Sequence, residues 1–345
     1  MRIFSGIQPT GRKHLGNFVG AIQQYVEGQQ RAVDHGDVAI YCIVDLHATT
    51  VAYEPRELRE RLYDTTAILL AAGLDPERCV LFRQSDVQEH AELAWLLCSV
   101  TSHGDLNRMH QFKDKSAQQR ELVSAGLFVY PTLMAADVLA YRAHDVPVGD
   151  DQRQHVELMR DIAIRFNARF GAGADGEPQE VLVVPEHRIP AVGARIMDLQ
   201  DPTRKMSTTG GSVEGTVYVL DEPAAITKKF KRAVTDSDNE IRHDRAAKPG
   251  VSNLLELLAV SRGTSIDEAQ ASMADARGYG DLKTAVGEAV IEMLAPVQER
   301  YAQLRHDEAA LEATLAAGAE KARAIASDTL ADVRAVMGVG PVAAG

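Results

Sequence analysis

The amino-acid sequence predicts an α/β fold, a doubly wound parallel sheet followed by an all-helical domain. Two observations predict it. Over the first half of the chain, short apolar segments alternate with segments of helical periodicity, which is the pattern of a parallel sheet with helices on both faces. From residue 251 to residue 338 the pattern is almost wholly helical and rich in Ala, Leu and Glu.

The elements follow in order along the chain. Strands are expected at residues 2–7, 38–44, 79–85 and 145–149, and helices at residues 17–33, 55–73, 90–102, 130–143 and 150–170. Pro55 suits the first turn of its helix, and Gly73 suits a C-cap. Asp150 and Asp151 are expected in the first turn of the helix that they open. The character of the sequence changes after about residue 190, which predicts a domain boundary there.

Length and composition narrow the class of protein. The chain has 345 residues and a formal net charge of −12, which disfavours nonspecific binding to nucleic acid. Its three cysteines lie at irregular spacing in apolar runs, so we expect buried, reduced thiols and no disulfide framework. The sequence has no signal peptide and no run long enough to span a membrane, which predicts a soluble cytoplasmic protein.

The loop after the first strand, SGIQPTGRKHLGN at residues 5–17, holds the first candidate site. Gly6 and Gly11 match the opening of a phosphate-binding P-loop, but Arg12 replaces its lysine and Lys13 its Mg²⁺-binding hydroxyl. The loop is therefore an ordinary turn, a damaged P-loop or another way of holding a nucleotide. A second segment, DPTRKMSTTGGS at residues 201–212, is either a polar surface loop or a binding site for a leaving polyphosphate.

Together these segments resemble the paired signatures of class I aminoacyl-tRNA synthetases: HLGN at 14–17 stands for HIGH and KMSTT at 205–209 for KMSKS. Further segments are similar to the bacterial tryptophanyl-tRNA synthetases: SGIQPTG, YPTLMAAD, VPVGDDQRQHVEL, GARIMDLQDPTRKMS and AVTDS. The resemblance runs from residue 3 to about residue 338. It implies a Rossmann-like catalytic domain over residues 1–190. The KMSKS-type loop and a helical tRNA- and anticodon-binding domain follow over residues 191–338, with a frayed tail at 339–345. The last helix could pack back on the catalytic domain.

The family activates L-tryptophan with ATP to tryptophanyl-adenylate and pyrophosphate, and then transfers tryptophan to tRNA(Trp). Neither step needs a protein nucleophile, so the protein must position the reactants and stabilise phosphate charge. The resemblance implies catalytic roles for His14, Asn17, Lys115, Lys205 and Ser207.

The resemblance also implies two neighbouring binding sites. The ATP site would consist of Gln8, Pro9, Thr10, Gly16, Asn17, Gly149, Asp150, Asp151, Ile196, Lys205, Met206, Ser207, Thr208 and Thr209. The tryptophan site would consist of Phe4, Gln8, His47, Tyr130, Met134, Asp137, Val146, Val148 and Gln152. Asp137 would accept the indole N–H, although on sequence grounds alone a solvent-facing helix acid is the simpler interpretation.

The sequence departs from the family pattern at Thr208, where a lysine is usual, and at Thr209, where a serine is usual. Loss of one cation could weaken phosphate stabilisation by ~2–4 kcal/mol unless Arg204, Lys113 or Lys115 compensates. Mg²⁺ is implied, bound through the ATP phosphates and not by a metal site of the protein.

The expected partners follow from the same resemblance. A local basic patch lies on a solvated helix face or contacts tRNA; its residues are Lys228, Lys229, Lys231 and Arg232. The resemblance also implies a homodimer and no membrane partner. Three alternatives remain: a tyrosyl enzyme of the same architecture, a regulatory protein that binds tryptophan or tRNA with weak charging, and a nucleotidyltransferase that shares only the first signature.

Overall fold

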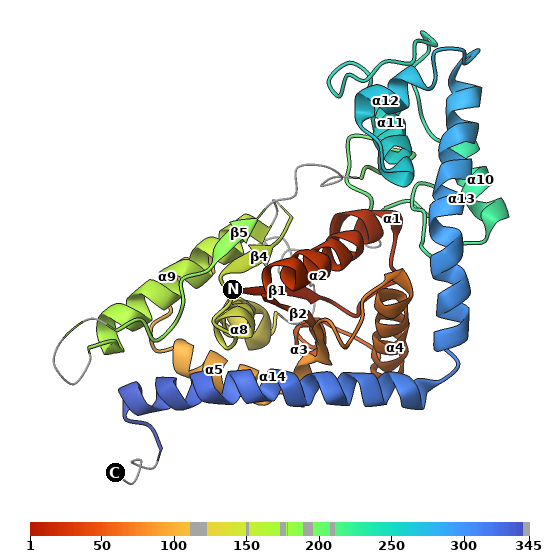
Figure 1. Cartoon of the computed structure of the whole chain (residues 1–345). Coiled ribbons are helices and arrows are strands. Elements are labelled where there is room, and N and C mark those ends of the chain that lie inside the picture. Colours follow the sequence, from red (N-terminus) through yellow and green to blue (C-terminus); the bar gives the residue numbers. More distant parts are fainter. Residues whose placement is uncertain are drawn as a thin grey trace.

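A five-stranded parallel sheet forms the centre of the molecule in the computed structural model (Figure 1). The structure describes residues 1–110, 123–149, 152–172, 177, 179–188, 196–207 and 211–340. The strands are β1 (Arg2–Ile7), β2 (Val38–Ile43), β3 (Val80–Arg83), β4 (Asp145–Pro147) and β5 (Glu186–Arg188). Their order is β3-β2-β1-β4-β5 and every pair is parallel, which confirms the doubly wound, Rossmann-like fold.

Helices cover both faces of the sheet because successive strand residues point to opposite sides. Ile3, Tyr41 and Leu81 belong to one apolar core, which lies under α2 (Gln23–His35) and α4 (Pro55–Ala72). Phe4, Ile40, Cys42, Val80 and Phe82 belong to the other, with α5 (Glu89–Leu97), α8 (Ala125–Leu139) and α9 (Arg153–Phe170). Both faces are thus buried, as a parallel sheet requires.

Several predictions about local structure are corrected. The strand β5 was not predicted, because its three residues are charged or polar and form no apolar run. Helix α8 begins at Ala125, earlier than expected, because the Ser124 hydroxyl caps it by accepting from the Leu127 N–H at 3.1 Å. The helix then continues through Pro131. Helix α9 begins at Arg153 in the described structure, and Asp150 and Asp151, expected in its first turn, lie outside the described residues. Cys98 is exposed, whereas Cys42 and Cys79 are buried as expected.

The short elements complete the first part of the chain. They are α1 (Leu15–Asn17), a π-helical turn (Phe18–Ile22), α3 (Asp45–Ala48), a 3-10 turn (Gln84–Asp86) and α6 (His103–Arg108). The later part consists of α10 (Pro223–Lys231), α11 (Pro249–Arg262), α12 (Ile266–Ala271), α13 (Tyr279–Leu304) and α14 (Glu308–Met337). The C-terminal part is therefore all-helical, as predicted.

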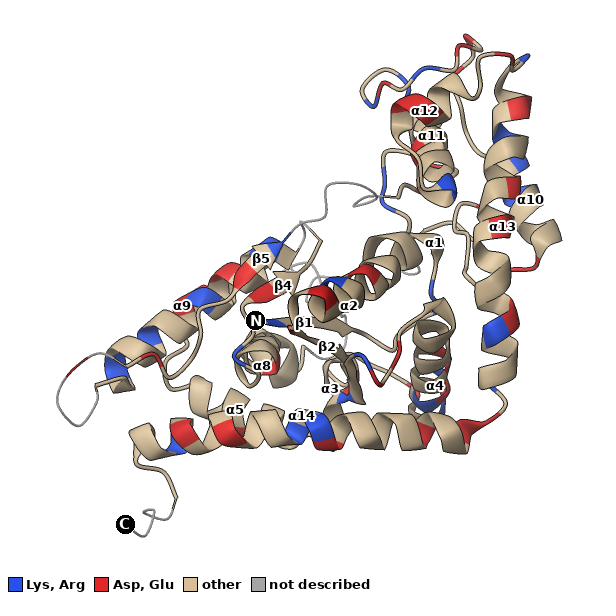
Figure 2. Ribbon diagram, viewed as in Figure 1, with Lys and Arg blue, Asp and Glu red and all other residues tan. Residues whose placement is uncertain are grey.

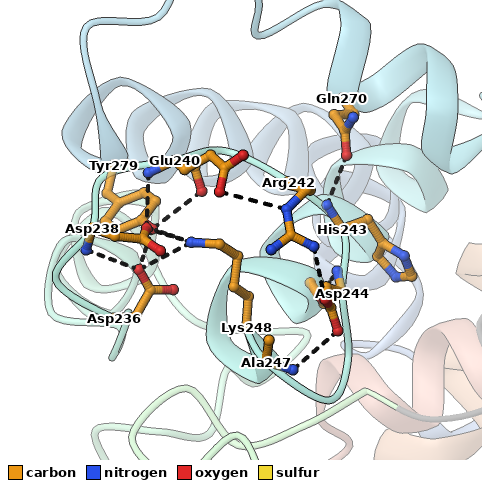
Figure 3. A network of polar contacts seen from close by, with 11 residues as sticks. Asp236, Asp238, Glu240, Arg242, His243, Asp244, Ala247, Lys248, Gln270 and Tyr279 are labelled. Atoms are coloured by element: carbon orange, nitrogen blue, oxygen red, sulfur yellow. Dashed lines mark hydrogen bonds and ion pairs between the residues drawn. The ribbon is translucent and has the colours of Figure 1, made fainter.

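The segment between α10 and α11 has no regular structure and is organised around one buried ammonium group (Figure 3). Lys248 donates to Asp236 Oδ1 at 3.2 Å and to Asp238, and its ammonium lies 3.1 Å from the Tyr279 hydroxyl. That hydroxyl also contacts Asp238 Oδ1 at 2.8 Å. The ion pairs lie within this segment, and the hydrogen bonds of the Tyr279 hydroxyl join it to the start of α13, so the segment is fixed without a helix or strand of its own.

Helix α14 returns from the helical region and passes α4 and α5 (Figure 1). It packs along β3, which is an edge strand of the sheet. The sequence left the position of this helix open. Gly318 faces the strand: a Cβ atom there would lie 1.8 Å from the Leu81 carbonyl oxygen. The absent side chain lets the two backbones touch. Glu312 adds an ion pair with Arg83 at 2.6 Å, so the helix is held against the strand by packing and by charge.

Candidate functional site

A cavity of about 540 Å³ opens where the strand order reverses, at the carboxyl ends of β1 and β4. Ligands bind at this switch point in open α/β sheets. Ile7 and Gln8 reach the cavity from the end of β1, and Val148 and Gly149 from the end of β4. His47, just after β2, closes one wall. The fold alone therefore selects this cavity as the candidate site.

The structure brings together every residue expected to bind tryptophan. The residues of that set that line the cavity are Phe4, Gln8, His47, Tyr130, Met134, Asp137, Val146, Val148 and Gln152. Phe4, Met134, Val146 and Val148 give this end of the cavity an apolar wall. An apolar wall with few polar groups suits a flat, mostly apolar ligand that carries a small number of hydrogen-bonding atoms.

Asp137 is the one carboxylate among the described residues that line the cavity. Its side chain is only 2% exposed, which corrects the interpretation of a solvent-facing acid. The Oδ2 atom lies 2.7 Å from His47 Nε2, and Oδ1 lies 2.6 Å from Gln84 Nε2 and 2.5 Å from His90 Nδ1. These contacts satisfy a buried polar group that would otherwise be costly.

Those neighbours also set the charge of Asp137. Burial by itself would raise the pKa of this carboxyl, but His47 and His90 hold the pKa well below its ordinary value. Asp137 is therefore an ionised acceptor at neutral pH. The pocket presents a fixed negative charge next to apolar walls, and such a charge selects a ligand with a hydrogen-bond donor at that point.

His90, Gln84 and Tyr141 were missed by the sequence analysis. Gln84 follows directly after β3, so its position at a strand end was a usable signal. His90 lies in α5, and Tyr141 follows α8. No sequence pattern brings these two together, because His90 meets Asp137 and Tyr141 only through the packing of two helices on the sheet.

The first signature loop is held by its own lysine. The Lys13 ammonium donates to the carbonyl oxygens of Gln8 at 2.6 Å and Thr10 at 3.4 Å. Gly11 has φ +64°, a conformation that suits glycine. Burial, together with the positive charge of Arg61 and partly offset by Asp64, lowers the pKa of Lys13 to about 8. Because Lys13 closes the turn, it takes no P-loop role, and the third interpretation of this loop is favoured.

His14 caps the helix that follows this loop. The ring Nδ1 of His14 accepts from the Asn17 backbone N–H at 3.3 Å, and the backbone N–H of His14 donates to Asn17 Oδ1 at 3.2 Å. Burial, with Lys205 and Lys13 nearby, lowers the pKa of His14 to about 4, so the ring is neutral at pH 7. With Nδ1 accepting, the proton lies on Nε2, which is then a donor at the cavity wall.

A small hairpin presents the second signature. Met206 N–H donates to the Ile196 carbonyl at 2.9 Å, and Asp198 N–H donates to the Arg204 carbonyl at 2.9 Å. The buried Asp198 side chain accepts from the backbone N–H of Gln200 at 2.7 Å and of Ser212 at 3.3 Å. One carboxylate thereby holds the two flanks of the segment that contains Lys205 and Ser207.

The predicted ATP residues divide into three groups. Gln8, Thr10, Asn17, Gly149 and Ser207 line the cavity, as does the catalytic candidate His14. A second group does not line the cavity but belongs to the first signature loop or to the hairpin: Pro9, Gly16, Ile196, Lys205 and Met206. Gly16 faces the His14 ring and Ile196. Lys205 is exposed. Lys113, Lys115, Asp150, Asp151, Thr208 and Thr209 lie outside the described residues.

The basic patch on α10 is partly used within the fold. Lys229 donates to the Thr216 carbonyl and to Asp221 Oδ2, both at 2.6 Å. Lys228, Lys231 and Arg232 are exposed. Elsewhere Lys and Arg alternate with Asp and Glu along the helices (Figure 2). Three exposed cations therefore remain for an anionic partner at this position.

No helix in the described part of the chain is long and apolar enough to cross a membrane. No group of three or more His, Cys, Asp or Glu side chains there could hold a metal ion.

Comparison with known proteins identifies relatives that cover almost the whole chain. Residues 1–295 match the family model "tRNA synthetases class I (W and Y)". The tryptophan–tRNA ligase 2 of Streptomyces avermitilis is 49% identical over 95% of this chain and 94% of its own length. The tryptophan–tRNA ligase of Oceanobacillus iheyensis is 48% identical over 98% of each.

Solved structures of tryptophanyl-tRNA synthetases are also similar to this chain. The tryptophanyl-tRNA synthetase of Mycoplasma pneumoniae has a TM-score of 0.88 and 35% identity, with 98% of each chain covered. That of Campylobacter jejuni, complexed with ADP and tryptophan, has a TM-score of 0.80 and 31% identity over 98% of this chain and 100% of its own.

Proposed function

This chain belongs to the class I tRNA synthetases of the tryptophan and tyrosine type, and we infer from this that the cavity described above joins tryptophan to ATP. The protein is a tryptophan–tRNA ligase: it activates L-tryptophan with ATP, releases pyrophosphate and transfers tryptophan to tRNA(Trp). The observation that carries the proposal is the buried, ionised Asp137 at the apolar end of the cavity.

At this end we propose that the indole ring lies between the apolar side chains and donates its N–H to Asp137. A site built to pair with one N–H rejects rings without it, because the buried carboxylate would then lose a partner. Tyr130 and Gln152 line the cavity near by, and they are proposed to bind the ammonium group. Gln8, between the two ends, is proposed to reach the carboxylate.

At the other end we propose that the α-phosphate of ATP lies near His14, Asn17 and Ser207. The tryptophan carboxylate oxygen attacks the phosphorus in line, and pyrophosphate leaves with the bonding electron pair. His14 Nε2–H and the Asn17 amide are neutral donors for phosphate oxygens. Lys205 and Ser207 stabilise the charge that develops on the leaving group. In this scheme the residues position and stabilise, and none forms a covalent bond.

The family uses ATP, and we propose that Mg²⁺ accompanies it, bound by phosphate oxygens. The residues described here fit that arrangement, because the cavity offers neutral donors and no carboxylate cage at its phosphate end. Bound there, the ion would neutralise phosphate charge. Lys115 is proposed to add a further cation from the segment at 111–122, which lies outside the described residues.

The surface of the C-terminal helices is the proposed contact for tRNA. Lys228, Lys231 and Arg232 are exposed on a chain that is otherwise acidic, and a local patch of this kind suits a phosphate backbone. We also propose a cytoplasmic location, since the charged tRNA is used there.

We further propose a homodimer. Two large apolar side chains are exposed on neighbouring helices: Trp95 on α5 is 77% exposed and Val129 on α8 is 40% exposed, and an interface with a second copy would bury such side chains. Sedimentation equilibrium tests the proposal, and a monomer at every protein concentration would refute it. Because Trp95 is the only tryptophan in the chain, its fluorescence reports on the same surface during dilution.

Pyrophosphate–ATP exchange, run separately with tryptophan and with tyrosine, tests the proposed function directly. We expect exchange that depends on tryptophan alone. Exchange with tyrosine would support the tyrosyl alternative, and no exchange in folded protein would support the regulatory alternative. The relatives at 48–49% identity, all named as tryptophan–tRNA ligases, favour the first outcome.

A further inference from the structure

Behind the cavity wall, a chain of buried polar groups continues from Asp137 into the core. His90 Nδ1 lies 2.5 Å from Asp137 Oδ1, and His90 Nε2 lies 2.6 Å from the Tyr141 hydroxyl. The side chains of His90 and Tyr141 are fully buried. Neither residue lines the cavity, so neither touches a ligand there.

Aromatic packing fixes the positions of these groups. The Tyr141 ring stacks on Phe4 with a centroid distance of 5.5 Å, and the Phe82 ring lies 5.8 Å from both Tyr141 and His90. Phe4 is itself a cavity residue. The polar chain is therefore enclosed by rings that pack directly behind the ligand wall, with little room for His90 to rotate.

The hydrogen-bond roles follow from the acceptor at the end of the chain. An ionised carboxylate only accepts, so His90 Nδ1 donates to Asp137. Nε2 accepts from the Tyr141 hydroxyl when the ring carries one proton and donates to it when the ring carries two, so the contact holds the ring in either form. Burial raises the pKa of Tyr141 well above its ordinary value, so that hydroxyl keeps its proton. Tyr141 thus orients His90, and His90 orients Asp137.

The two oxygens of Asp137 differ in their surroundings. Oδ1 accepts from both His90 and Gln84, and the Gln84 amide is itself fixed because its Oε1 accepts from the Leu46 N–H at 3.0 Å. Oδ2 has one contact in the described structure, with His47, a residue of the cavity wall. The carboxylate is anchored through Oδ1 and leaves one lone pair of Oδ2 on the cavity side.

We propose that His90, backed by Tyr141, is a positioning residue for amino-acid specificity. It holds Asp137 so that Oδ2 meets a ring N–H in the cavity. This inference rests on the proposed function and deepens it, because it names residues outside the cavity that set the choice of substrate. Without His90 the carboxylate would turn about its bond to Cβ, and its acceptor would no longer be aimed at the ligand.

The test compares tryptophan with β-(1-benzothiophen-3-yl)alanine, in which sulfur replaces the indole N–H, in the pyrophosphate exchange assay. His90→Leu should lower kcat/KM for tryptophan by on the order of 10- to 100-fold, since it removes a charge-assisted hydrogen bond that orients the acceptor. The KM for ATP and the kcat/KM for the analogue should change little. His90→Asn, whose amide N–H can replace the Nδ1–H, should restore most of the preference for tryptophan.

His103→Leu is the matched control, because it makes the same change at an exposed histidine outside the cavity, and it should leave both substrates unaffected. Equal losses for tryptophan and the analogue in His90→Leu, or an equal rise in the KM for ATP, would show a merely structural role and overturn the proposal. If His90→Leu does not fold, Tyr141→Phe is measured in its place. A lower ratio of kcat/KM for tryptophan to kcat/KM for the analogue supports the proposal, and an unchanged ratio overturns it.

Failure of the proposed function has a different signature. Wild-type protein that shows no tryptophan-dependent exchange would refute the ligase assignment and this inference with it. If the wild type and the variants all prefer tryptophan over the analogue to the same degree, only the positioning role of His90 is refuted.

Discussion

Replacing Gly318 by alanine should force α14 away from the edge of the sheet. The new methyl carbon would lie 1.8 Å from the Leu81 carbonyl oxygen and 2.7 Å from its carbon. Both are backbone atoms of β3, so no side-chain rotation can relieve the overlap. Since ordinary contact begins at 3.4 Å, the two backbones must separate by about 1.6 Å.

Two opposing effects set the magnitude. Overpacking of this kind costs ~3 kcal/mol, the upper part of the usual range, because a helix and a buried strand must both move. Alanine in place of glycine within a helix recovers ~1 kcal/mol through its higher helix propensity. The expected net loss is therefore ~2 kcal/mol, equivalent for a chain of this length to a fall of about 3 °C in Tm.

Thermal unfolding followed by circular dichroism measures the effect, with Gly287→Ala as the matched control. Gly287 also lies buried in a long helix, α13, but the nearest atom to its added methyl group would be Phe230 Cβ at 3.6 Å, an ordinary contact. This variant should gain up to ~1 kcal/mol, so the two substitutions should shift Tm in opposite directions.

The same displacement should reach the cavity. Strand β3 leads directly into Gln84, which donates to Asp137, so Gly318→Ala should raise the KM for tryptophan more than the KM for ATP. Equal Tm values for the two glycine variants would contradict the close contact between α14 and β3, and the reasoning built on it would fail.

Three further predictions concern the site. Asp137→Asn replaces an acceptor with a donor and should raise the KM for tryptophan by about 30-fold, while the KM for ATP stays constant in the exchange assay; equal effects would exclude an indole contact. Burial, with Arg61 adding to it, lowers the pKa of Lys13 from 10.5 to about 8, so between these pH values the unfolded chain binds more protons than the folded one and stability rises with pH. Urea unfolding of the wild type and of Lys13→Met measures the effect: the free energy of unfolding of the wild type should increase with pH relative to that of the variant. A difference between the two that does not change with pH would contradict the low pKa. Thr208→Lys restores the usual cation of the second signature and should leave the exchange rate unchanged or raise it; a large loss would mean that Thr208 makes a contact of its own.

The main elements and the cavity residues could be predicted because their signals are local. Apolar runs marked β1 and β2, and Pro55 and Gly73 correctly marked the two ends of α4. The ligand wall was predicted from the resemblance of short motifs, each of which stays together in the fold. Asp137 was predicted as a site residue in this way, although on sequence grounds alone a solvent-facing acid was the simpler interpretation.

The surroundings of Asp137 could not be predicted, because they are assembled from distant segments. His47, Gln84 and His90 arrive from different elements, and their meeting depends on how helices pack on the sheet. The same reason explains the errors at Cys98, whose apolar neighbours in sequence suggested burial, and at β5, which pairs with β4 although its residues are polar. Sequence periodicity reports which face of an element is apolar, but not which elements share a core.

The packing of α14 against β3 has a consequence for the growing chain on the ribosome. Strand β3 ends at Arg83, and the helix that covers its open edge begins only at Glu308, so the edge stays bare while residues 84–307 are synthesised. An unpaired strand edge is a template for pairing with other chains. A chain that stops before residue 308 would therefore have an open sheet edge and would tend to aggregate. In this protein, the edge of the sheet can be covered only after the residues of α14 have been synthesised.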